Sequence, residues 1–469
     1  MTPRQYYADP HVRERIREYL GAVAGRAPTA AYVASIRQQD ARPVVWEHAR
    51  RHPASNVEEP CRDGADIARS LLDSDNLIFL LELDYLNPDA PAEPFTHPAE
   101  VLFKLEPAYQ AVRRVLGSFG LKAYSLATGR GYHFTARIPV TAPVLDGLAD
   151  LVPEVPAWVH TLESRRDPGL SYSVSTRIAR AWAGLGCLVE YLANLVIAAA
   201  PPDVIPFVFN GTRVGTGLIG RECVSIDFSY VGDPLDARYT RCAFSAYQWH
   251  HFRPDIFGAT TAKMVPEMAA VPRGRRALLS FMRGGRSLDA GRQAARRGPA
   301  TLPDVSVAME KVLAQYRASP LAAFHREFYA GRRHPAAMSI PEGLPPCALA
   351  SLLQPNDLLL RPEHLQHLVR TLLARGWPAA RVSALVESTY LADHAWGDRW
   401  RLNMDPATRA EFDVRVFAGM IASGADRLID FNCVSAQEKG LCPRRACAFD
   451  LRIDAERLAR TLPVQDSGR

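Results

Sequence analysis

Three carboxylates inside apolar stretches are the residues of this chain whose types and spacing could do chemistry. Glu82 and Asp84 end one apolar run, two residues apart, and Asp227 stands inside a second one. Side chains alternate across a strand, so Glu82 and Asp84 share one face. Two buried like charges are costly unless a cation pairs with them, and hard divalent cations prefer oxygen ligands. We therefore predict that Glu82, Asp84 and Asp227 hold Mg²⁺ or Mn²⁺.

A glycine-bearing turn separates the two apolar runs and ends in a histidine. It spans residues 128–133, and its polar members include Thr128, Arg130 and His133. Paired metal ions can clamp the attacking and leaving oxygens of a phosphoryl transfer, while a cationic or hydrogen-bonding group orients the phosphates. Each of these motifs is weak by itself, because acids at strand ends and glycine turns occur in proteins of every function. Their order along the chain and their strand context strengthen the joint signal.

Together the three stretches resemble the archaeo-eukaryotic primase superfamily, which includes primase-polymerases. That family carries an acid-x-acid strand, then a small-hydroxyl-to-histidine motif, then an aspartate on a strand. Its first acid is usually aspartate, whereas this chain has Glu82. The resemblance covers residues 70–260 and implies a template-dependent nucleotidyltransferase, a DNA primase or primase-polymerase. Such an enzyme makes or extends primers from NTPs or dNTPs on a single-stranded nucleic-acid template by two-metal phosphoryl transfer.

The resemblance also assigns roles to individual residues. The catalytic metal ligands would be the three carboxylates Glu82, Asp84 and Asp227. The incoming triphosphate would bind to the glycine turn and to a basic strand farther along the chain. The implied nucleotide-binding residues are Thr128, Arg130, His133, Arg241 and Ser245, with His250 as a weaker candidate.

Four of the eight cysteines, Cys347, Cys433, Cys442 and Cys447, lie in the last third of the chain. Four thiolates in one helical domain suit a tetrahedral zinc ion or an iron–sulfur cluster. Their spacing is not that of a Cys-x2-Cys knuckle, so four unrelated buried cysteines remain an alternative. The segment also resembles the helical C-terminal domain found beside many primase modules, which opens with Pro-Pro-Cys and ends in a cysteine triplet. That resemblance favours a 4Fe–4S cluster, with Zn²⁺ as the second choice.

Composition and periodicity predict an α+β protein in four parts. We expect a helical lead-in over 1–70, packed on a primase-polymerase-like catalytic domain over 71–270 with mixed or antiparallel sheets. An arginine-rich basic linker follows over 271–335, and an all-α domain with the metal or Fe–S cysteines occupies 336–460. The basic segment could equally contact nucleic acid, since clustered arginines suit phosphate groups.

Size and composition limit the class of protein. A chain of 469 residues with 48% hydrophobic content can build real cores, which argues against global disorder. The net charge of +6 is only weak evidence for a polyanionic partner. The apolar stretch 181–200 carries Glu190 and Asn194, so a buried helix is a better interpretation than a membrane span. We expect a cytoplasmic protein with no membrane partner.

Two other functions stay open from the sequence. Three acids and a histidine also serve phosphodiester hydrolysis in metal-dependent nucleases, although the turn at 128–133 favours triphosphate binding over water activation. The protein could instead be a catalytically weak nucleic-acid-binding protein of a replication or defence system, which would use the basic segment and the cysteine domain. The expected partners are a single-stranded template and NTPs or dNTPs, and the sequence leaves open any partner from replication or a mobile element.

Overall fold

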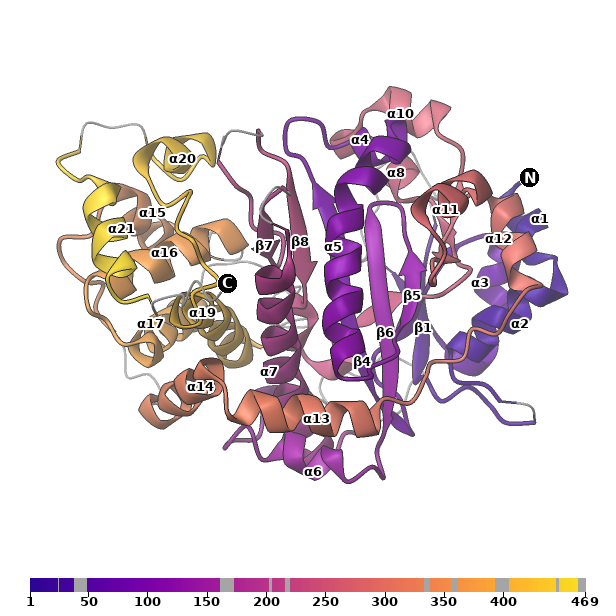
Figure 1. Ribbon diagram of the computed structural model, residues 1–469, viewed down its shortest axis with the longest axis horizontal. Helices are drawn as coiled ribbons and strands as arrows, with labels where there is room; N and C mark the ends of the chain where they lie inside the picture. Colours follow the sequence, from indigo (N-terminus) through magenta and orange to yellow (C-terminus); the bar gives the residue numbers. More distant parts are fainter. Residues whose placement is uncertain are drawn as a thin grey trace.

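A six-stranded sheet forms the middle of the fold, in the spatial order β12-β5-β6-β4-β8-β7 (Figure 1). Neighbouring strands are antiparallel except for the parallel pair β7–β8. The strands are β4 (Asn76–Leu86), β5 (Tyr124–Ala127), β6 (Gly131–Pro139), β7 (Phe207–Phe209), β8 (Cys223–Asp227) and β12 (Val271–Pro272). The computed structural model describes residues 1–23, 25–37, 49–160, 173–201, 205–215, 220–332, 338–355, 359, 361–392, 405–443 and 447–462.

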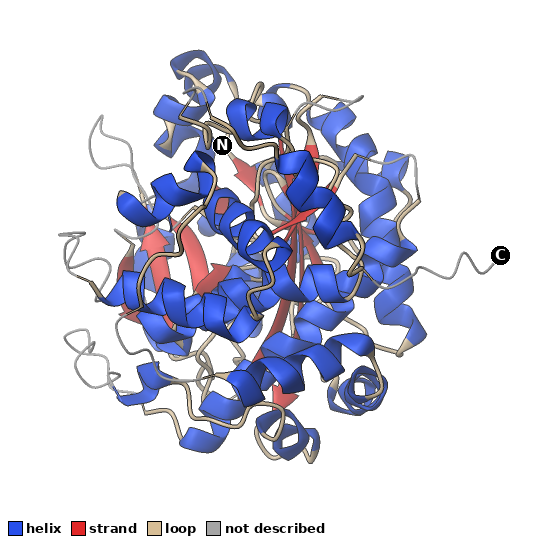
Figure 2. Cartoon of the chain, turned by 90° about the vertical axis from the view of Figure 1, so that its left-hand side faces the viewer, coloured by secondary structure: helices blue, strands red, loops and turns tan. Residues whose placement is uncertain are grey.

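A second, antiparallel sheet has the order β2-β1-β3-β9 and joins the start of the chain to its middle. Its strands are β1 (Tyr32–Ile36), β2 (Arg50–Pro53), β3 (Asp66–Ser70) and β9 (Tyr239–Arg241), and a small ribbon pairs β10 (Ala246–Tyr247) with β11 (Met268–Ala269). The fold is therefore α+β with mixed and antiparallel sheets, which confirms the expected class. Figure 2 shows helices surrounding the strands on several sides.

Two long helices cover one face of the central sheet. These are α5 (Pro98–Ser118) and α7 (Thr176–Ala199), which pack on β4 and on each other in front of the sheet in Figure 1. Helix α7 is long and apolar enough to cross a membrane, but 72% of its most apolar window is buried inside the protein. The interpretation as a buried helix is thus confirmed. Shorter helices around this layer are α4 (Glu93–Thr96), α6 (Val144–Ala149), α8 (Trp249–Phe252), α9 (Pro254–Phe257) and α10 (Ala259–Met264).

The sequence predicts a helical lead-in over the first 70 residues, but this segment also contains strands. Helices α1 (Pro3–Tyr7), α2 (Pro10–Tyr19) and α3 (Glu58–Asp63) are present, but β1, β2 and β3 make up most of the second sheet. Strand β3 pairs with β1 on one side and β9 on the other, and all five of its residues are buried. Pairing with strands distant in sequence decides this segment, which local periodicity does not reveal.

The arginine-rich segment expected to be a linker is folded instead. It contributes β12, α11 (Leu278–Gly284), α12 (Leu288–Ala295), α13 (Ser306–Arg317) and α14 (Pro320–Gly331). Two of its arginines are buried: Arg273 pairs with Glu106 and contacts the rings of Tyr109 and Phe281, and Arg286 is 9% exposed. Charge density alone predicts solvent exposure, whereas aromatic faces and backbone carbonyls hold these guanidinium groups inside.

The remaining helices divide between two cores. They are α15 (Pro346–Leu353), α16 (Pro362–Ala374), α17 (Ala379–Leu391), α19 (Pro406–Ala422), α20 (Cys433–Glu438) and α21 (Leu451–Ala459). Helices α16, α17 and α19 share one continuous apolar core with the central sheet. A separate small cluster, here called the cysteine cluster, contains Cys347, Phe431, Leu441 and Leu451. The all-α part therefore shares a core with the central sheet over much of its length.

A buried charge network ties helix α7, which packs on the central sheet, to these helices. Glu190 of α7 is fully buried and contacts Arg415 of α19, and its Oε1 lies 3.2 Å from Nε2 of His325 on α14. Burial alone would raise the pKa of Glu190, but Arg415 and His325 hold it below its usual value. Helix α19 can approach α7 closely because Gly419 has no Cβ. A Cβ at this position would clash with the Glu190 carboxylate. The two parts are thus joined by a paired, desolvated charge.

Replacing Glu190 by Ala should lower the free energy of unfolding by about 3–5 kcal/mol, because it leaves Arg415 buried without its carboxylate. Urea denaturation followed by circular dichroism measures the change. Glu327→Ala, which removes an exposed acid on α14, is the matched control and should change stability by less than about 0.5 kcal/mol. Equal stabilities for the two variants would contradict a structural role of this pair.

Candidate functional site

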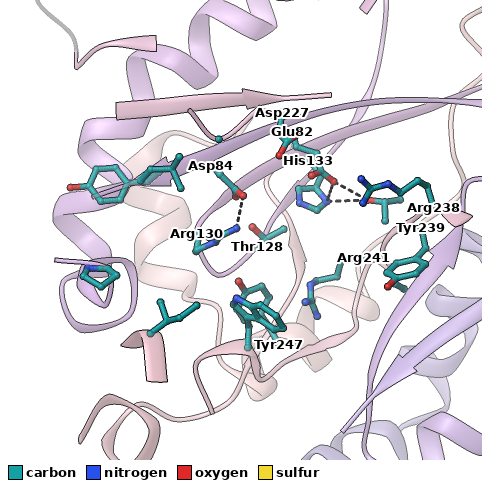
Figure 3. A pocket seen from close by; sticks show the side chains of 18 of the residues that line it. Glu82, Asp84, Thr128, Arg130, His133, Asp227, Arg238, Tyr239, Arg241 and Tyr247 are labelled. Atoms are coloured by element: carbon teal, nitrogen blue, oxygen red, sulfur yellow. Dashed lines mark hydrogen bonds and ion pairs between the residues drawn. The ribbon is translucent and has the colours of Figure 1, made fainter. Parts of the chain in front are cut away.

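Strand register brings the three separate motifs into one row. On β4, Glu82 lies directly opposite His133 of β6 on one side and Asp227 of β8 on the other. Residues directly opposite each other in antiparallel strands place their side chains on the same face. Asp84 lies two residues farther along β4, on that face too. Figure 3 shows Asp227, Glu82 and His133 together, with Asp84 beside them.

The local sequence explains why these polar groups stay on one face of β4. From residue 82 on, burial alternates, with Leu83 and Tyr85 in the core and Glu82 and Asp84 partly exposed. Glycine is needed where β6 meets this strand, because a Cβ at Gly131 would clash with the backbone carbonyl of Leu83. The sequence therefore fixes both the face of the acids and the close approach of the turn.

The row opens into a cavity of about 910 Å³. The cavity contains all three candidate metal ligands and the turn residues Thr128, Arg130 and His133. Its wall is rich in arginine, since Arg51, Arg130, Arg213, Arg238 and Arg241 all line it. An acidic floor within a cationic wall suits a ligand that combines metal ions with phosphate groups.

The acids are close enough to perturb one another. Burial, followed by the neighbouring charges of Asp227 and Asp84, raises the pKa of Glu82 well above its usual value. His133 does not supply a compensating charge, because burial lowers the pKa of its imidazole to about 4. At neutral pH His133 is therefore an uncharged hydrogen-bonding group. Its Nδ1 lies 3.1 Å from Oγ1 of Thr240 and 3.3 Å from Oε1 of Glu82.

The turn that carries Thr128 and Arg130 is braced from two sides. Within the turn, Oγ1 of Thr128 accepts a hydrogen bond from the Gly131 amide at 3.2 Å. From outside, the buried Arg286 donates to the carbonyl oxygens of Thr128 and Gly129. The ring of Tyr247 packs so closely on Gly129 that a Cβ there would clash with it. The arginine-rich segment thus supports the turn rather than linking two domains.

Of the three nucleotide-binding candidates that follow Asp227 in the chain, one lines the cavity and two are internal. Arg241 lines the cavity, where its guanidinium pairs with Asp66 at 2.9 Å and stacks on the ring of Tyr247. Ser245 is fully buried and outside the cavity lining: its Oγ accepts from the Ile67 amide and donates to the Ala246 carbonyl. His250 is buried as well, 3.2 Å from the Val265 carbonyl oxygen. The structure therefore does not bring Ser245 and His250 to the cavity with the other candidates.

Sequence reasoning missed several residues of the site. Thr240 contacts both Glu82 and His133 from the second sheet, directly beside the sequence candidate Arg241 in β9. Arg238 reaches the cavity while paired with the buried Asp233. No local pattern marks Arg213, Arg238 or Arg286, because their positions depend on partners far away in sequence.

The carboxylate set fits a hard divalent cation by its chemistry. All three donors are oxygens, and the raised pKa of Glu82 indicates that a bound cation would relieve their repulsion. In the conformation described, no three His, Cys, Asp or Glu side chains of the described residues lie close enough to ligate one ion. At Asp84, Oδ2 accepts a hydrogen bond from Nη2 of Arg130 at 2.7 Å.

The structure brings three of the four late cysteines together. Cys347 is buried in the cysteine cluster, and Cys433 and Cys442 pack against the same cluster. Cys447 is exposed, with its Sγ 3.8 Å from the Phe449 carbonyl oxygen. A residue not foreseen, His367, places Nε2 3.1 Å from Sγ of Cys347. These sulfur donors suit the soft metals of an iron–sulfur or zinc centre, and burial followed by Cys442 raises the pKa of Cys347 to about 12.

No protein-family model matches this chain, and no curated protein matches it either.

The cysteine cluster should carry iron or zinc when the protein is purified without oxygen, because neighbouring thiolates bind such metals tightly. Cys442→Ser should lose the metal and loosen the cysteine cluster, while the main core stays folded because it is a separate apolar cluster. Metal analysis and thermal unfolding measure both effects. Cys61→Ser, at a buried cysteine of the main core, is the control and should keep its metal. Wild-type protein without either metal would contradict the prediction.

Proposed function

We propose that the protein is a template-dependent nucleotidyltransferase, a primase or primase-polymerase. It makes or extends primers on a single-stranded template from NTPs or dNTPs. The observation that carries this proposal is the row of Asp227, Glu82 and His133 across three paired strands, at the floor of an arginine-lined cavity. The resemblance in motif order to the primase superfamily supports the nucleotide as substrate.

The residues divide the work of phosphoryl transfer. Mg²⁺ or Mn²⁺ held by the three carboxylates would activate the primer 3′-hydroxyl and neutralise charge on the leaving pyrophosphate. Arg130 and Arg241 face the same cavity and can offset the remaining triphosphate charge. His133 contributes hydrogen bonding without charge, and the contacts of Thr240 fix its ring. The attacking oxygen forms a bond to the α-phosphorus as the bond to pyrophosphate breaks.

The arginine wall favours nucleotide transfer over simple hydrolysis. A nuclease needs its acids, a water molecule and enough positive charge for one phosphodiester. Here five arginines from separate segments line the cavity, which suits a triphosphate together with a strand phosphate. A metal-dependent nuclease and a non-catalytic nucleic-acid-binding protein remain the outcomes against which the proposal is tested.

The deciding experiment incubates the protein with a primed single-stranded template, Mg²⁺ or Mn²⁺, and labelled NTPs or dNTPs. Extension is expected. Asp84→Asn and Asp227→Asn should each lower the rate by on the order of 10³-fold, because a lost ligand removes several kcal/mol of transition-state stabilisation. Asp150→Asn, at an exposed acid, should keep the wild-type rate. Shortening of the primer or the template would indicate a nuclease. Binding of the template without extension or shortening would indicate a nucleic-acid-binding protein.

The brace on the turn gives a second test. Arg286→Met should raise KM for the nucleotide about tenfold or more with a smaller effect on kcat, because it removes charge-assisted hydrogen bonds to the turn. The matched control is Arg283→Met, because Arg283 is exposed on α11 and stands three residues before Arg286. If Arg283→Met raised KM as much, general basicity of the segment would explain the effect and the brace would not.

A further inference from the structure

Arg130 occupies one of the candidate metal ligands. Its Nη2 donates to Oδ2 of Asp84 at 2.7 Å, as the dashed line in Figure 3 shows. Both side chains face the cavity, with relative exposures of 31% for Arg130 and 16% for Asp84. The guanidinium therefore takes one of the acceptor positions that Asp84 would offer to a cation.

The Arg130 guanidinium competes with a metal ion for the Asp84 carboxylate. It takes one of the lone-pair positions of Oδ2, and its positive charge repels a cation at the same side chain. A metal ion therefore binds Asp84 more weakly while Arg130 stays paired with it.

The backbone around Arg130 allows this exchange without moving the turn. The carbonyl oxygen of Arg130 accepts from the Tyr85 amide at 3.0 Å, so the main chain is fixed to β4. Arg286 and Tyr247 hold the preceding residues of the turn. Movement is left to the long side chain, which already lies in the cavity expected to receive the triphosphate.

Two other arginines of the wall differ from Arg130. Arg241 pairs with Asp66, and Arg238 pairs with Asp233. Neither partner is a candidate metal ligand, so a metal ion can bind without breaking these pairs. Arg130 is thus suited to respond directly to the ion.

We propose that Arg130 exchanges between Asp84 and the phosphates of the nucleotide, so that it opposes metal binding in the free protein and couples metal binding to nucleotide binding. This inference rests on the proposed function. The coupling must be reciprocal: a nucleotide that draws Arg130 away raises affinity for the metal ion, and the metal ion raises affinity for the nucleotide. A guanidinium suits both partners, because it binds carboxylates and phosphates through the same donors.

The test measures Mn²⁺ binding to the full chain without nucleotide. Electron paramagnetic resonance detects the free ion during the titration. Arg130→Gln should bind Mn²⁺ at least about fivefold more tightly than the wild type, the lower end of usual coupling strengths. ATP and dATP binding, measured by equilibrium dialysis at saturating Mn²⁺, should weaken in the same variant. These opposite changes would not follow from general loss of structure. Arg283→Gln is the control for removing a positive charge elsewhere and should leave both affinities unchanged.

Asp84→Asn separates this inference from the proposed function. If Mn²⁺ binds to the wild type and is lost in Asp84→Asn, while Arg130→Gln binds it no more tightly than the wild type, the exchange is overturned and the metal site stands. If Asp84→Asn binds Mn²⁺ as the wild type does, or if no protein binds it, the metal site itself is overturned together with the exchange. Tighter Mn²⁺ binding with unchanged nucleotide binding in Arg130→Gln would also overturn the exchange, because Arg130 would then have no second partner.

Discussion

The antiparallel register of β6, β4 and β8 is the constraint on which the site depends. It sets Glu82 opposite both His133 and Asp227, although these residues are separated by 51 and 145 positions in the chain. A slip of one residue on either neighbouring strand would turn its polar side chain to the apolar face. Leu83 and Tyr85 are buried on the opposite face of β4, which makes such a slip costly. Packing of the core therefore also fixes the positions of the acids.

The arrangement concentrates charge and leaves it incompletely neutralised. Glu82 has a raised pKa among its acidic neighbours, and the nearby imidazole is neutral. Arg130 provides a local counter-charge for Asp84. The fold holds these carboxylates close together despite their electrostatic repulsion. A divalent cation with a polyanionic ligand would reduce that repulsion.

The arginines serve two purposes that composition cannot separate. Some, such as Arg213 and Arg238, face the cavity while acids hold them: Glu363 of α16 for Arg213 and Asp233 for Arg238. Others, such as Arg286, are internal and stabilise backbone turns through their planar donors. Oδ1 of Asp233 also lies 3.4 Å from Nη1 of Arg409 on α19. The C-terminal helices therefore contact the acid that holds Arg238 in the cavity wall. The helical part is therefore part of the site's support rather than a tethered module.

The sequence by itself determined the chemistry-bearing motifs and the face on which each lies. Alternation in a strand places Glu82 and Asp84 together, a central acid marks α7 as a buried helix, and mixed periodicities predict an α+β fold. Only the tertiary structure decided which strands pair, and hence that Thr240 joins Glu82 and His133 while Ser245 and His250 turn inward. It also decided that the arginine-rich segment folds against the central sheet and that one core continues into the C-terminal helices. The physical reason is that local periodicity reports which face of an element is apolar, whereas pairing register and charge burial depend on partners in other segments of the chain.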